Sequence, residues 1–211
     1  MRNNFKILFY LVVTVIVSVS FAGSFDDFFV AIRNDNGAAV TGLLKRGFDA
    51  NTRDEKGQPG LTIAMQERSM KAAAALLEQP SINVNALNAA GESALMLAAL
   101  KGELAGARLL LQRGAEVSLP GWSPIHYAAT GPDPRLVQLL LDRGADINGA
   151  SPNGTTPLML AARYGAEESV KLLLERGADV TRRNQRGLGS SDFARLAGRD
   201  ALVKRLEQLA R

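Results

Sequence analysis

His126 and Trp122 are the only histidine and the only tryptophan of the chain, and they lie four positions apart in the stretch GWSPIHYAAT. Histidine suits general acid–base catalysis near neutral pH, but that chemistry also needs an orienting partner and a nucleophile or activated water. Tryptophan has a large apolar surface and is enriched at protein interfaces. The pair therefore raises two hypotheses, a catalytic site at His126 and a binding surface at Trp122.

Other kinds of catalytic or metal site have little support in the composition. The chain holds no cysteine, which excludes disulfides, thiolate nucleophiles and cysteine-based zinc sites. A single histidine would leave a zinc ion with carboxylate ligands only. No glycine-rich phosphate-binding loop followed by Lys-Ser or Lys-Thr occurs. We expect no cofactor, no metal and no catalytic residue.

The sequence repeats itself with a period near 33 residues. The stretches GESALMLAALKGELAGARLLLQRGAEV, GWSPIHYAATGPDPRLVQLLLDRGADI and GTTPLMLAARYGAEESVKLLLERGADV share one frame, and weaker copies flank them. The glycines that open the units are spaced 34, 30, 33 and 33 residues apart, which is typical of a stacked repeat array. These glycines are Gly57, Gly91, Gly121, Gly154 and Gly187.

Each unit carries the signals of two helices. A Ser-Pro or Thr-Pro pair, as at Ser123 and Thr156, predicts a capped start for a short first helix. Paired alanines then allow close packing, and a leucine triplet predicts a second helix that buries its leucines. That helix is expected to end at a glycine in the left-handed conformation, as at Gly114, Gly144 and Gly177.

With these motifs the chain resembles the ankyrin-repeat family. The resemblance rests on SPIHYAA, TPLMLAA and the recurring LLLxRGA end, and it covers nearly all of residues 23–211. It implies an all-α solenoid of about six stacked helix-turn-helix units with short hairpin-like fingers, which acts as a binding scaffold. We expect the units at approximately 25–53, 54–87, 88–118, 119–150, 151–183 and 184–211.

Two departures from the family pattern stand out. The unit from Gly57 has Pro59-Gly60 in place of Thr-Pro and Gln79-Pro80 in place of the closing glycine turn, which puts its geometry in question. The 30-residue interval before Gly121 shortens the finger that carries Trp122. We expect this finger to project less than its neighbours.

The repeat frame separates the two opening hypotheses. His126 occupies the position of the family's histidine, which bonds neighbouring backbone, and Met96 and Met159 at equivalent positions cannot perform acid–base chemistry. We therefore interpret His126 as a stacking residue. Trp122 has mostly polar counterparts in the other units, which indicates exposure, although packing over its neighbours remains the alternative.

The acidic residues that recur once per unit also take a structural interpretation. Neighbours in this series would lie roughly 10 Å apart, the spacing of packed helices, which is too far to share one metal ion. We expect them to form turn and finger hydrogen bonds. They are Asp49, Glu116, Asp146 and Asp179.

In ankyrin arrays, the ends of the inner helices commonly contact the partner. Transferring the frame predicts a partner-binding patch of mixed apolar, aromatic and charged character, as in interface hot spots. Its residues are Gln66, Glu92, Leu100, Lys101, Trp122, Arg163 and Tyr164.

The first 22 residues have basic Arg2 and Lys6, an uncharged apolar run from Ile7, and small residues up to Ala22. This is the pattern of a secretory signal peptide, with cleavage expected between Ala22 and Gly23. The alternative is an uncleaved membrane anchor, because the run is borderline in length for spanning a bilayer.

The charge balance and the expected export indicate which class of partner the protein binds. The chain has 25 basic and 21 acidic residues, and loss of Arg2 and Lys6 would leave 23 against 21, too balanced to indicate nucleic-acid binding. We expect a monomeric, exported protein in the bacterial periplasm, or alternatively anchored to the inner membrane or secreted. It would bind, hold or inhibit a co-exported or envelope protein. The alternative function is a membrane-tethered scaffold that assembles or protects an envelope enzyme, for example in oxidative-stress defence.

Overall fold

The computed structural model describes residues 23–211, and the expected signal peptide at 1–22 lies outside the described residues. Every regular element in the described part is a helix, as the repeat pattern predicted. None of these helices is long and apolar enough to cross a membrane. Residues 23–33 form the first helix. The others are α2 (Gly37–Lys45), α3 (Gly60–Gln66), α4 (Met70–Leu77), α5 (Ala94–Lys101), α6 (Leu104–Gln112), α7 (Pro124–Thr130), α8 (Pro134–Asp142), α9 (Pro157–Tyr164), α10 (Glu167–Glu175), α11 (Ser190–Leu196) and α12 (Asp200–Leu209).

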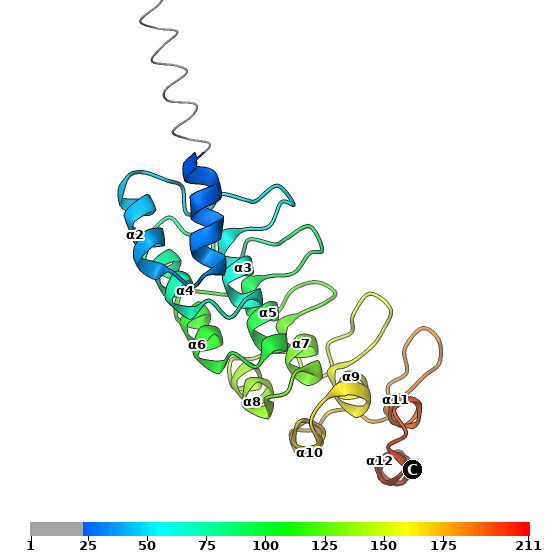
Figure 1. The fold of residues 1–211 in the computed structure, drawn as a ribbon. Coiled ribbons are helices and arrows are strands. Elements are labelled where there is room, and N and C mark those ends of the chain that lie inside the picture. The colour runs from blue at the N-terminus through cyan, green and yellow to red at the C-terminus, as the bar shows by residue number, and fades with distance from the viewer. Residues whose placement is uncertain (1–22) are drawn as a thin grey trace, which may run out of the picture.

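The helices pair into consecutive units and stack in two rows. The inner row contains α3, α5, α7, α9 and α11, each in contact with the next, and the outer row runs through α2, α4, α6, α8 and α10 in the same way. The stack is curved, and the inner helices and the fingers line its concave side (Figure 1). Residues 23–211 form an all-α solenoid, the architecture that the resemblance implied.

The helix boundaries follow the predicted capping residues. The side-chain oxygen of Thr156 accepts a hydrogen bond from the backbone N–H of Met159 at the start of α9, and Ser93 does the same for Met96 at α5. Both bonds satisfy amide groups that the first turn of a helix leaves free. At the other end, Gly114, Gly144 and Gly177 each have φ of +84°, the left-handed conformation expected after the second helix.

The core lies between the two rows and differs from the prediction in one detail. The paired alanines of α5, α7 and α9, such as Ala98 and Ala99, are fully buried and let the inner helices approach closely. Each leucine triplet, however, buries only its middle member completely, as at Leu110. The outer leucines of the triplets are partly buried against the core, except Leu109, which keeps 37% of its surface exposed, so the expectation fails only at Leu109. Three consecutive residues cover about 200° of a helix and cannot all face inward.

The unit from Gly57 folds as a helix pair in spite of its unusual sequence. Pro59 occupies the N-cap of α3 without a side-chain cap, and α4 ends at Leu77, followed by Glu78 in a right-handed conformation. A Cβ atom at Gly60 would lie 2.9 Å from Cδ1 of Ile32. Glycine at this position therefore lets the side chains of the first helix pack closely against the start of α3.

The finger that leads into α7 is the short one. It spans residues 113–123, whereas the finger before α9 spans 143–156 and is three residues longer. Gly121 has φ of +82°, and a Cβ there would lie 3.1 Å from Cγ of Pro152 in the next finger. The short finger thus packs closely against its neighbour.

Candidate functional site

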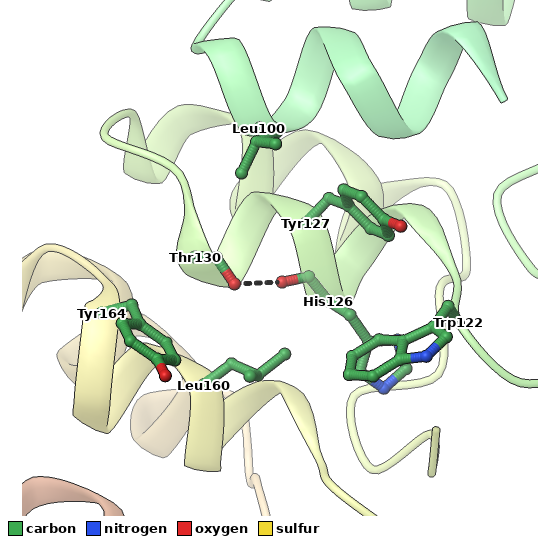
Figure 2. A pocket seen from close by; sticks show the side chains of 7 residues that line it. All are labelled: Leu100, Trp122, His126, Tyr127, Thr130, Leu160 and Tyr164. Atoms are coloured by element: carbon green, nitrogen blue, oxygen red, sulfur yellow. Dashed lines mark hydrogen bonds between the residues drawn. The ribbon is translucent and has the colours of Figure 1, made fainter. Parts of the chain in front are cut away.

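The concave side holds an open apolar pocket of about 220 Å³ that spans three consecutive units. α5 contributes one wall, α7 and the short finger contribute the floor, and α9 contributes the opposite wall (Figure 2). Aromatic and aliphatic side chains dominate the surface. The lining residues are Leu100, Trp122, His126, Tyr127, Thr130, Leu160 and Tyr164.

The floor helix α7 is one residue shorter than α5 and α9. Gly131 ends α7 in an extended conformation, with φ of −73° and ψ of 169°. Pro132 follows, and a proline disfavours the helical conformation of the residue before it. A Cβ at Gly131 would lie 2.5 Å from the carbonyl oxygen of Ala99, so only glycine fits there. Where its neighbours carry Lys101 and Tyr164, α7 therefore carries no side chain.

His126 forms the base of the pocket and is 1% exposed. Its Nδ1 accepts a hydrogen bond of 3.2 Å from the backbone N–H of Ser123. The neutral ring therefore carries its proton on Nε2, which donates to the carbonyl of Gly149 in the next finger at 3.0 Å. Burial lowers the pKa of His126 below its ordinary value. Both ring nitrogens are engaged with backbone, and the interpretation of His126 as a stacking residue is confirmed.

Trp122 is both packed and accessible. Its indole meets the His126 ring edge to face, with the ring centroids 5.4 Å apart, yet 39% of its surface remains exposed. The close-up shows the indole lying across the imidazole at the mouth of the pocket (Figure 2). The repeat frame predicted that Trp122 is exposed, and the alternative was that it packs over its neighbours. Both hold in part, because the indole packs on His126 and still keeps part of its surface accessible.

Tyr127 links the pocket to the preceding finger. Its hydroxyl donates a 3.1 Å hydrogen bond to Oε1 of Glu92, whose Oε2 accepts another from Asn88 at 2.9 Å. Burial, the nearby Glu92 charge and this hydrogen bond raise the pKa of Tyr127 to about 12. The hydroxyl remains protonated at physiological pH, and the Glu92 carboxylate is held by two donors.

Arg163 and Lys101 adjoin lining residues of α9 and α5, the two helices that wall the pocket. The Arg163 guanidinium lies 4.9 Å from the ring centroid of Tyr164, a cation–π contact at a wall of the pocket. Lys101 follows the lining residue Leu100 at the end of α5. Tyr164 is 55% exposed, so this wall also offers aromatic surface.

The structure brings together part of the predicted patch. Leu100, Trp122 and Tyr164 line the pocket, whereas Gln66 ends α3 and is not among the lining residues. The frame-based prediction did not include Tyr127 and Leu160 in the patch. Tyr127 lies three residues before the concave position Thr130, and residues three or four apart share one face of a helix, so that spacing could have identified it.

The recurring acidic residues form the expected finger hydrogen bonds. Asp49 accepts from the backbone N–H of Asn51 at 2.9 Å, Asp146 from Asn148 at 2.9 Å and Asp179 from Thr181 at 2.9 Å. No cluster of three or more possible metal ligands occurs among residues 23–211. These carboxylates stabilise the turns of the fingers. The candidate site is therefore the apolar pocket, with Lys101 and Arg163 beside it.

A family model for ankyrin repeats in three copies matches residues 28–120 and again 118–184. The chain belongs to the ankyrin-repeat family. Members of this family typically bind other proteins and lack catalytic activity of their own.

Curated ankyrin-repeat proteins from animals and bacteria are similar to parts of the chain. The rat ankyrin repeat and SAM domain-containing protein 6 is 39% identical over 50% of the chain, which spans only 12% of that relative. A putative ankyrin repeat-containing protein of Treponema pallidum is 32% identical over 58% of the chain and 42% of its own length. A putative ankyrin repeat protein of Rickettsia bellii is 32% identical over 61% of the chain and 39% of its own length.

A solved structure is similar over most of the solenoid. It is the complex of a predatory endopeptidase from Bdellovibrio bacteriovorus with an immunity protein. The matching chain has a TM-score of 0.75 and 26% identity, and the alignment covers 86% of the present chain and 97% of that chain.

Proposed function

We propose that the protein is a non-catalytic scaffold that binds, holds or inhibits a co-exported or envelope protein through its concave face. The observation that carries this proposal is the open apolar pocket with its half-exposed Trp122 and Tyr164. Aromatic side chains that remain accessible beside a pocket are the usual anchors of protein interfaces. The likeness to a complex of an endopeptidase with an immunity protein supports an inhibitory or protective relation to the partner.

The environment of His126 supports binding without catalysis. Both of its ring nitrogens are hydrogen-bonded to backbone or to Ser123, and Trp122 covers the ring. A general base needs a ring nitrogen that can reach a substrate proton. Substitution of His126 is therefore expected to affect stability, and a turnover that His126→Met abolished in a folded protein would contradict the proposal.

Capture from the native envelope tests the binding function. The wild-type chain is immobilised beside the double variant Trp122→Ala/Tyr164→Ala, with Leu109→Ala as a control because Leu109 is a partly exposed leucine of an outer helix. We expect one defined protein to be retained by wild type and control and lost with the double variant. Equal capture by all three proteins would contradict the role of the pocket.

We further propose that the protein acts in the bacterial periplasm. The support is the signal-peptide pattern of residues 1–22. Cell fractionation together with the intact mass of the isolated protein tests this. A mass that begins at Gly23 in the periplasmic fraction is expected. Retention of Arg2 and Lys6 in a membrane fraction would instead favour the tethered scaffold that assembles or protects an envelope enzyme, and a cytoplasmic full-length chain would contradict both.

A further inference from the structure

The size and chemistry of the pocket indicate what it receives. A volume of about 220 Å³, with leucines on two walls and aromatic rings at the floor and mouth, accommodates one large apolar side chain. The Thr130 hydroxyl donates a 2.9 Å hydrogen bond to the carbonyl oxygen of His126 within α7, so this donor is not available to a ligand (Figure 2). Little polar surface is left to hold a polar ligand.

Several carboxylates of the surrounding elements are already engaged. Glu92 is held by Tyr127 and Asn88. Glu103, at the N-cap of α6, forms an ion pair of 2.9 Å with Arg68, and Asp133, at the N-cap of α8, pairs with Arg135 at 2.7 Å. At the end of α3, Glu67 accepts a hydrogen bond from Gln66. None of these carboxylates forms an ion pair with Lys101 or Arg163.

The carbonyl groups at the C-terminal ends of α5 and α9 also accept hydrogen bonds from other arginines. Arg68 donates to the carbonyl of Lys101 at the end of α5. Arg199 donates to the carbonyls of Ala161, Ala162 and Gly165 near the end of α9. These arginines neutralise the negative ends of the two helices that wall the pocket. Lys101 and Arg163 are not required for that purpose.

Lys101 and Arg163 thus carry charge that the described residues do not compensate. Neither forms an ion pair within residues 23–211, in contrast to Arg33, Arg68 and Arg135. Lys101 adjoins the lining residue Leu100 in α5, and Arg163 adjoins the lining residue Tyr164 in α9, so the two cations belong to the two helices that wall the pocket. Charge complementarity therefore favours a partner with acidic groups on both sides of its apolar anchor.

We infer that the pocket receives a protein segment that inserts one large apolar side chain and carries acidic residues on both sides of it, which Lys101 and Arg163 meet. This inference rests on the proposed function and specifies the partner of the same site. The apolar anchor supplies most of the affinity, and the two cations select the acidic sequence around it.

Selection of random peptides tests the inference independently of any natural partner. Twelve-residue peptides displayed on phage are selected on the full-length chain, with counter-selection on Trp122→Ala/Tyr164→Ala. We expect the retained peptides to share one Leu, Met, Phe or Trp with Asp or Glu within three positions on both sides. Because Trp122 is the only tryptophan of the chain, its fluorescence in the presence of a tryptophan-free selected peptide reports whether the pocket itself is occupied.

Charge reversal separates the anchor from the acidic flanks. We expect Lys101→Glu/Arg163→Glu to weaken binding of a fluorescein-labelled selected peptide by about fivefold and to favour a version in which Lys replaces the acids. The matched control is Arg108→Glu/Arg143→Glu on the outer side, which changes the net charge equally and should leave binding unchanged. Replacing the apolar anchor of the peptide by Ala should weaken binding by about tenfold.

Each part of the inference can fail separately. Apolar anchors without acidic enrichment, or equal effects of the two charge reversals, would overturn the role of Lys101 and Arg163 and leave the binding function standing. Selected peptides that do not change Trp122 emission would overturn the pocket as their site. A dimer in analytical ultracentrifugation that Trp122→Ala/Tyr164→Ala dissolves, with no peptide enrichment, would identify a second copy of the chain as the occupant and overturn the inference.

Discussion

At the scale of single residues, His126 shows how one position in a repeat can be filled by different chemistry. Its Nδ1 accepts from the backbone N–H of Ser123, and the sulfur atoms of Met96 and Met159 accept from the equivalent N–H groups of Ser93 and Thr156. Only the histidine also reaches the next finger, through Gly149. Its fit to backbone groups requires the neutral ring, because a protonated Nδ1 cannot accept a hydrogen bond.

Stability should therefore depend on pH through His126. Burial lowers the pKa of His126 in the folded chain below the ordinary value of 6.5, so the unfolded chain takes up the proton first as pH falls. Its contribution is fully present above pH about 6.5 and is lost as pH falls toward the folded pKa, with a slope of at most about 1.4 kcal/mol per pH unit. Urea unfolding between pH 7.5 and 5.5 measures this.

His126→Met is the matched control for the pH experiment, since methionine fills the same position in two neighbouring units and does not titrate. We expect its unfolding free energy to change less than that of the wild type over the same pH range. Parallel pH profiles for the two proteins would show that the pH dependence lies elsewhere.

At the scale of elements, helix ends determine the shape of each unit. Gly144 and Gly177 follow α8 and α10 in the left-handed conformation, and a Cβ at either position would have no atom within 4 Å. Glycine is favoured at these two positions because of the positive φ angle, and not because a neighbouring atom leaves no room for a side chain. Gly131 is required for the opposite reason, because its surroundings leave no room for a side chain.

Alanine substitutions at glycines should therefore change stability in opposite directions according to conformation. Gly144→Ala and Gly177→Ala should each lower the unfolding free energy by about 1 kcal/mol, the cost of a left-handed alanine. Gly42→Ala, inside α2, should raise it by about 0.5 kcal/mol, because its new Cβ meets only Arg46 at 3.7 Å and alanine favours the helix. Chemical unfolding of the three variants measures both signs, and a stabilising Gly144→Ala would contradict the argument.

At the scale of the whole molecule, asparagine side chains connect successive fingers. Oδ1 of Asn51 accepts from the N–H of Asn83 at 2.7 Å, and Asn148 does the same for Asp179 at 2.8 Å. Asn85 accepts from the N–H of Glu116 at 2.9 Å. The short finger 113–123 contains no asparagine, so the series is interrupted where the pocket lies.

Backbone amide exchange should reveal this interruption. Asp146 occupies the repeat position of Glu116 and Asp179, but within the described residues its N–H donates to no asparagine side chain. Its amide should exchange with solvent about tenfold faster than those of Glu116 and Asp179. Hydrogen exchange followed by NMR measures the three amides. Asn148→Ala should speed exchange at Asp179 and leave Glu116 unchanged, and equal rates in the wild type would contradict the interpretation.

Much of this architecture follows from the sequence alone, because every unit repeats the same local signals. Ser and Thr caps, paired alanines and closing glycines act within a few residues, so the helix pairs and the structural role of His126 could be predicted without coordinates. The frame also placed Leu100, Trp122 and Tyr164 on the concave side.

Only the tertiary structure decided which of these residues form a site. The pocket is lined by side chains of three consecutive units, among them Leu100, Tyr127 and Tyr164, and Gly131 lets α7 approach the carbonyl oxygen of Ala99 in the preceding unit. Whether Lys101 and Arg163 are uncompensated depends on the ion pairs that Arg68 and Arg135 form with the neighbouring carboxylates. Such contacts join residues that the repeat frame treats separately, because packing between units is set by the side chains of all the units that meet.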